Sequence, residues 1–269
     1  MIKMIKNINA SLLVVLFWFV CAIFGTFISL NENDIFLNKI LEGPSWENWC
    51  GYDHLGRSIC ERIILGARTS LCVAFVVVLI SFIVGTILGV VGAWCGGIYD
   101  KLLVILIDIF MAFPGILLAI ALAGLLGPGI LNTVIALSIV SWVGFSRLAR
   151  VQTLSIKNRD HIIAAHALGT LEYRITLKHV LPLIMAPLII EGTISFASVI
   201  IAEASLSFLG LGIQPPAASW GSMIKDGSQY MLVAPHMVLG PGFAILSLVL
   251  CINFFGDNLR SKLDIMESK

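Results

Sequence analysis

Residues 146–182 read SRLARVQTLSIKNRDHIIAAHALGTLEYRITLKHVLP and form the one long polar segment between runs that are otherwise nearly all apolar. The basic side chains of this segment outnumber its acidic ones, Asp160 and Glu172; they are Arg147, Arg150, Lys157, Arg159, Arg174 and Lys178. A positively charged loop between two membrane spans belongs on the cytoplasmic side. The segment therefore predicts a cytoplasmic loop with membrane spans before and after it.

The composition agrees with a membrane protein. Of the 269 residues, 58% are hydrophobic and 12% are charged, and the mean hydropathy is +0.99. A soluble domain carries about 25% charged residues. The basic residues lie along loops without interleaved aromatic residues, so nucleic-acid binding is not expected. The sequence predicts an all-α, polytopic protein that contacts membrane lipid.

Six apolar runs predict six transmembrane helices, the fourth of them shorter than the others; they cover residues 11–30, 70–94, 102–126, 130–145, 183–209 and 237–255. Pro114 should kink the third, because proline removes a backbone hydrogen bond. The predicted units are a cytoplasmic stub with the first span (1–30), an extracytoplasmic loop with a short interfacial helix at 61–68 (31–69), a core of five spans (70–257) and a cytoplasmic tail (258–269).

The distribution of charge predicts the orientation. The first run is too long for a cleaved signal peptide and is expected to remain as a span. With both termini in the cytoplasm, the inner segments carry twelve Lys and Arg residues and the outer segments carry five, as the positive-inside rule requires. Cys50 and Cys60 then share an outer loop, where a disulfide is open but not established by spacing alone.

A short helix is predicted in the middle of the polar segment. Asn158 or Asp160 is placed to cap its N-terminus, and Gly169 stands where a left-handed residue commonly ends a helix. Pro182 suits the first turn of the next span. Such a helix would dock on a partner protein or rest on lipid headgroups, and the pattern alone fits both.

Asp108, Glu191 and Glu203 are carboxylates within predicted spans. Because a charge in lipid is costly, they should face the bundle interior or a cavity. Their role would be to line a translocation path or form part of its gate, or to hold helices together as a polar clamp. Pro114 is a further candidate, since backbone groups freed at a kink often line a cavity. A proton-coupled transporter acting alone would also use such carboxylates, but it commonly has inverted repeats, and the sequence shows no convincing repeat.

Nothing in the sequence predicts catalysis or a metal site. The five histidines form no metal-ligand pattern, and no HExxH, GxxxxGK[ST] or GxSxG motif with a plausible base is present. The chain is therefore not expected to be an enzyme or to bind a cofactor or a metal. If ATP drives its function, another chain must hydrolyse it.

Several stretches resemble one family. Residues 164–182, AAHALGTLEYRITLKHVLP, resemble the cytoplasmic "EAA" loop of binding-protein-dependent ABC importer permeases. GYDHLGRSICERIILGARTSL, DIFMAFPGILLAIALAGLLGPG, AEASLSFLGLGIQPPAASWGSMI and PGFAILSLVLCINFFGDNLR resemble the dipeptide/oligopeptide/nickel branch, in order and at matching spacing. Two departures stand out: Ile163 occupies the position of the family's glutamate, and Tyr52 and Ser58 replace a threonine and an aspartate.

The resemblance implies an inner-membrane permease with a type I importer fold. It implies a second, similar permease subunit, two ATPase subunits that bind ATP and Mg, and an extracytoplasmic solute-binding protein. The polar loop would couple to an ATPase subunit through Arg159, Ala164, Ala165, His166, Gly169, Arg174 and Pro182. The expected solute is a short peptide, and nickel or a nickel chelate is the alternative.

Overall fold

The computed structural model describes residues 2–25, 34–46 and 48–267, and helices make up most of them. The helices are α1 (Ile2–Phe24), α2 (Ile59–Cys95), α3 (Gly97–Met111), α4 (Gly115–Leu126), α5 (Ile130–Lys157), α6 (Asp160–Ala167), α7 (Glu172–Ile175), α8 (Leu181–Phe208), α9 (Trp220–Ser228) and α10 (His236–Glu267). A 3-10 turn, η1 (Leu37–Lys39), and a π-helical turn, η2 (Thr176–Val180), are also present. The predicted all-α class is confirmed.

Four helical segments of the described residues are long and apolar enough to cross a membrane: α2, α5, the run Glu172–Phe208 that includes α8, and His236–Lys262 of α10. Helices α3 and α4 pass the same test only as a pair. The apolar part of α1, Ser11–Phe24, is shorter, and residues 26–30 of the predicted first span lie outside the described residues. The structure thus gives four or five spans, and the predicted count of six is not confirmed.

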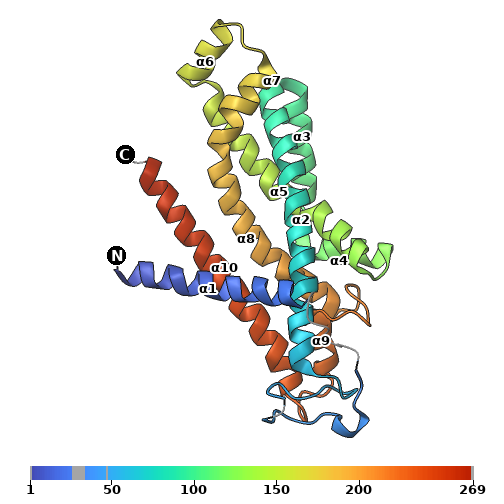
Figure 1. The fold of residues 1–269 in the computed structure, drawn as a ribbon. Helices are drawn as coiled ribbons and strands as arrows, with labels where there is room; N and C mark the ends of the chain where they lie inside the picture. The colour runs from blue at the N-terminus through green and yellow to red at the C-terminus, as the bar shows by residue number, and fades with distance from the viewer. Residues whose placement is uncertain (1, 26–33, 47, 268–269) are drawn as a thin grey trace.

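The third predicted span is broken rather than kinked. Helix α3 ends where Ala112 donates its backbone N–H to Asp108, and α4 starts after Pro114 at an angle of 84° to α3. Proline cannot donate a backbone hydrogen bond, and it disfavours helical geometry in the residue before it. These two effects together end one helix and start another (Figure 1).

Several helices extend beyond the predicted limits, and α2, α5 and α10 do so through polar sequence. Helix α2 starts at Ile59, so the predicted interfacial helix at 61–68 is its first part and not a separate element. Helix α5 continues to Lys157, and α10 continues through most of the predicted tail. The polar residues there have no proline or helix-ending glycine among them, so the helices continue past their apolar runs.

Helices α2 and α5 pack closely together in the core. A Cβ atom added to Gly85 would lie 2.7 Å from the Cβ of Phe145, and one added to Gly89 would lie 2.8 Å from the Cβ of Ala149. Small residues allow the backbones of membrane helices to approach and pack by van der Waals contact. The glycines of α2 therefore position α5, whose C-terminal end carries the polar segment.

The end of the molecule opposite α6 is a compact unit of the loop after residue 34 and α9 (Figure 1). Trp220 of α9 is fully buried, and its indole Nε1 donates a hydrogen bond of 2.9 Å to the carbonyl of Ile63 in α2. A disulfide joins Cys50 to Cys60. The sequence alone had left open whether these two cysteines are bonded. These links fix α9 and the loop to the start of α2.

Candidate coupling helix and charged cavities

Helix α6 projects from one end of the helix bundle (Figure 1). Its Ile162 is fully buried in a cluster with Ile156, Ile175 and Val180. All other residues of α6 are exposed or half-buried. One buried apolar side chain thus packs α6 against the bundle, and most of the surface of α6 remains available to a partner.

The C-terminal end of α6 has the predicted left-handed glycine. Gly169 has a φ of +74°, and its N–H donates to the carbonyl of His166 at 2.9 Å. The N–H of Thr170 donates to the carbonyl of Ala165 at 3.1 Å. This pair of bonds is a Schellman motif, which satisfies carbonyls that the helix leaves open. Only glycine adopts this backbone conformation without a steric cost.

The predicted N-terminal cap of α6 was wrong. Arg159, and not Asn158 or Asp160, is the capping residue, and it makes no side-chain capping bond. Asp160 lies in the first turn, where its negative charge stabilises the helix by interacting with the positive end of the helix dipole. At the other end of the segment Pro182 lies in the first turn of α8, as predicted.

A network of polar and ring contacts joins α6 to the end of α2. Trp94 donates from Nε1 to a carboxylate oxygen of Glu172 at 3.0 Å, and the other oxygen lies 3.2 Å from Nδ1 of His166. The rings of Trp94 and His166 stack at 5.9 Å. We refer to Trp94, His166 and Glu172 as the α6 anchor. Lys157 reinforces it by donating to the carbonyls of Ala93 and Trp94.

Sequence reasoning missed Trp94, Glu172 and a second link nearby. Arg150 of α5 forms two hydrogen bonds, of 2.6 and 2.8 Å, with the carboxylate of Asp100 in α3. A bidentate pair of this kind fixes the geometry of both side chains. The sequence signalled these links only through the basic residues of the predicted cytoplasmic loop. Those residues did not identify Asp100 as the partner of Arg150 or Trp94 as the partner of Glu172.

The outer surface of α6 and its flanks carries apolar and basic side chains. Leu168 is 85% exposed and Ile163 is 55% exposed. Arg159 and Ala164 are exposed, and Ala165 is half-buried. Arg174 is also exposed, and it donates to the hydroxyl of its neighbour Tyr173 at 3.0 Å. The structure thus places the predicted coupling residues other than Pro182 on and around one small helix, and the role of all of them stays a prediction.

The three predicted carboxylates lie in different surroundings. Glu203 is fully buried, accepts a hydrogen bond of 2.8 Å from Ser207 and keeps its second oxygen without a partner among the described residues. Ser207 also accepts from the N–H of Ile213. Glu203 thus ties α8 to the chain that follows it, which favours the clamp over the gate. Asp108 is exposed on α3, outside the bundle interior.

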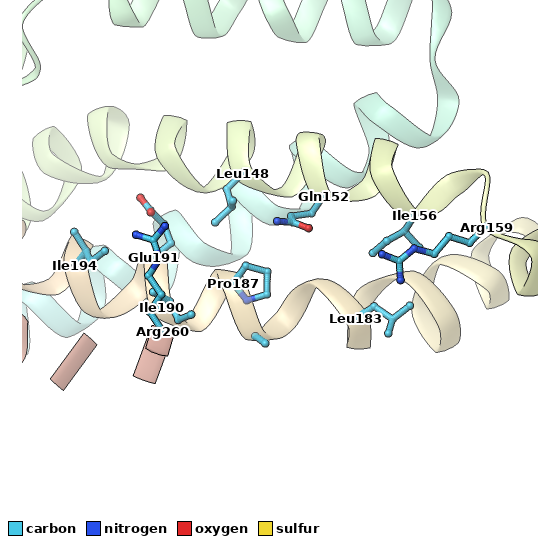
Figure 2. Close-up of a pocket in the computed structure, with 11 residues that line it drawn as sticks. Leu148, Gln152, Ile156, Arg159, Leu183, Pro187, Ile190, Glu191, Ile194 and Arg260 are labelled. Carbon is cyan, nitrogen blue, oxygen red and sulfur yellow. The ribbon is translucent and has the colours of Figure 1, made fainter. Parts of the chain in front are cut away.

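Glu191 is half-buried and faces two neighbouring cavities. The first, about 430 Å³, lies between α5, α8 and α10 and includes Gln152, Pro187 and Arg260 (Figure 2). The second, about 490 Å³, lies between α3, α5 and α8 and includes Arg147. Both include Leu148 and Glu191. Among the predicted path residues, Glu191 lines both of these cavities, and Pro114 separates α3 from α4.

Comparison with known proteins agrees with this architecture. The chain is 45% identical over 224 residues to the dipeptide transport system permease protein DppC of Alkalihalophilus pseudofirmus, covering 83% of this chain and 74% of that protein. It is 40% identical to the glutathione transport system permease protein GsiD of Pectobacterium atrosepticum, over 87% and 77% of the two chains. It is also 40% identical to the di/tripeptide transport system permease protein DppC of Pseudomonas aeruginosa, over 96% and 88%.

The fold is similar to that of a solved ABC transporter. An inward-facing structure of the MetNI methionine ABC transporter matches with a TM-score of 0.60 and 20% identity, covering 74% of this chain and 95% of that chain. A family model described as "binding-protein-dependent transport system inner membrane component" matches residues 81–265. The chain therefore belongs to the family of inner-membrane permease components of binding-protein-dependent ABC importers.

Proposed function

We propose that this chain is the permease subunit of an ATP-driven importer of short peptides. It forms half of a translocation path with a second, similar permease subunit and receives solute from an extracytoplasmic binding protein. The names of the relatives above specify dipeptides, di- and tripeptides, or glutathione. These names favour a peptide over nickel or a nickel chelate, which would be imported by the same mechanism.

Coupling to ATP occurs at α6. Two separate ATPase subunits bind ATP and Mg, and this chain binds neither. The observation that carries the proposal is the geometry of α6: Ile162 roots it in the bundle while Ile163 and Leu168 remain exposed. An exposed apolar surface on a short, well-closed helix fits a groove on another protein. Arg159 and Arg174, both exposed at its flanks, would face acidic groups on the ATPase surface.

Movement of α6 would reach the spans through defined contacts. ATP binding closes the ATPase pair and carries α6 with it. The α6 anchor passes this movement to the end of α2, and the short connection through α7 and η2 passes it to α8. In the proposed membrane orientation, α6 and both chain termini lie in the cytoplasm, and the disulfide lies on the outer side. A proton-coupled transporter acting alone would need neither ATPase subunits nor α6.

Co-purification tests the proposal. Leu168→Arg places a charge on the exposed surface of α6 and is expected to abolish capture of the ATPase subunits by a tag on this chain. Leu232→Arg is the matched control, because Leu232 is fully exposed in the segment between α9 and α10; its capture should equal that of the wild type. Equal capture with both variants would contradict docking at α6.

A further inference from the structure

The face shared by α3, α5 and α8 carries charges on segments that are long and apolar enough to span a membrane, α3 as part of its pair with α4. Glu191 lies ten residues into α8, about 15 Å along its axis, and Arg147 lies well within α5. Charged side chains within membrane spans face protein or a water-filled cavity rather than lipid. Arg147 and Asp108 are exposed and Glu191 is half-buried, so the interior of this subunit does not cover them. This face therefore meets water or another subunit.

Glu191 stands at the junction of the two cavities described above. The first brings Arg260 to it from α10, and Figure 2 shows the Arg260 side chain extending toward Glu191. The second brings Arg147 to it from α5. The volumes of about 430 and 490 Å³ fall within the usual range of small-molecule sites. One negative group thus lines two neighbouring cavities, and each of these cavities also includes a positive group.

These charges are near one another without being paired. No ion pair of the described residues includes Glu191, Arg147 or Arg260. The one polar contact of Arg147 in the described chain is a long one, 3.7 Å to the sulfur of Met111. By contrast, Arg150 of the same helix holds Asp100 at 2.6 Å. The hydrogen-bonding capacity of Glu191 and Arg147 therefore remains available to a ligand.

We propose that Glu191, Arg147 and Arg260 form a subsite for a zwitterionic solute, which rests on the proposed function as a peptide importer. The carboxylate of Glu191 accepts hydrogen bonds from the ammonium group at the peptide N-terminus. The guanidinium groups of Arg147 and Arg260 donate to the carboxylate at the C-terminus, in the geometry that such pairs favour. The half-exposed site binds weakly, because water screens the charges, and weak binding allows release.

The same arrangement disfavours a metal cation. Two guanidinium groups beside one carboxylate repel a divalent ion. Among the described residues no three His, Cys, Asp or Glu side chains are grouped to hold a metal. The ligand class that matches one carboxylate and two guanidinium groups is a small molecule with both an ammonium and a carboxylate.

The test uses the membrane complex purified by a tag on this chain, without the binding protein. Saturation-transfer NMR measures contact with dialanine and with N-acetyl-dialanine amide, which lacks both terminal charges. The wild type should give a signal with dialanine and none with the capped peptide. Glu191→Gln and Arg147→Gln should reduce the dialanine signal about tenfold. Glu61→Gln, at the opposite end of the bundle in α2, should leave the signal unchanged.

Equal signals from the free and capped peptides would overturn the subsite, and this comparison needs no variant. A full dialanine signal in Glu191→Gln would overturn it as well. ATP-driven import of dialanine by the wild-type complex with its binding protein tests the proposed function separately. Import without dependence on Glu191 would reject the subsite alone, whereas absence of import would reject the peptide importer.

Discussion

Trp94, the penultimate residue of α2, donates a hydrogen bond of 3.0 Å to Glu172, the first residue of α7. The two residues are 78 positions apart in the chain. Together with the stacking of Trp94 on His166, this bond holds α6 against the span that packs on α5. The exposed helix and the membrane core are thus joined by side chains as well as by the chain itself.

Trp94→Phe keeps the aromatic ring and removes the indole donor. A net hydrogen bond is worth about 1 kcal/mol, and Glu172 is largely exposed, so the loss should be smaller than that. We expect peptide-stimulated ATP hydrolysis to fall about two- to threefold while the ATPase subunits remain bound. Trp49→Phe, at an exposed site outside the anchor, is the control. Unchanged hydrolysis in Trp94→Phe would show that the anchor plays no part in coupling.

Gly169→Val tests the left-handed end of α6. A side chain would meet nothing within 4 Å, so the cost arises from the backbone conformation, about 1–2 kcal/mol for a residue that is not glycine. We expect normal amounts of protein in the membrane, retained basal ATP hydrolysis and at least tenfold lower uptake. Gly169→Asn, which tolerates this conformation better, should recover part of the uptake. Normal uptake by Gly169→Val would contradict the role of α6.

Trp220→Phe tests the buried link between α9 and α2. The change removes the bond to Ile63 and leaves a small cavity, which should destabilise the protein by about 1–3 kcal/mol. The expected result is a lower midpoint in thermal unfolding of the purified complex. Trp46→Phe is the control, because Trp46 is 96% exposed. Equal midpoints for the two variants would show that the link contributes nothing.

The disulfide and the free cysteines test the orientation together. In intact cells an impermeant maleimide should label Cys50 and Cys60 only after reduction, because they are joined in the outer loop. Cys95, a free and exposed cysteine at the end of α2, should react only after the membrane is opened. Labelling of Cys95 in intact cells would place α6 outside and invert the proposed arrangement.

The sequence predicted the elements that depend on local chemistry. Long apolar runs gave the positions of the main membrane helices. Gly169 correctly marked the C-terminal end of α6, and Pro182 correctly marked the start of α8. Both follow from backbone preferences that act within a few residues. The charge excess of residues 146–182 identified the segment that carries α6.

The remaining features depend on contacts between distant parts of the chain. The anchor bond from Trp94 to Glu172 depends on how α2 and α5 cross, which no local pattern contains. The meeting of Glu191, Arg147 and Arg260 depends on three separate helices. The bend at Pro114 reached 84° because the chain stops one helix and starts another, whereas proline alone predicts only a kink.

The most direct test of the central claim is uptake of a labelled dipeptide and of radioactive nickel, measured in parallel in cells with and without this gene. The account predicts that deletion of the gene abolishes dipeptide uptake and leaves nickel uptake unchanged. Reintroducing the wild-type gene should restore dipeptide uptake. Loss of nickel uptake with normal dipeptide uptake would contradict the peptide importer.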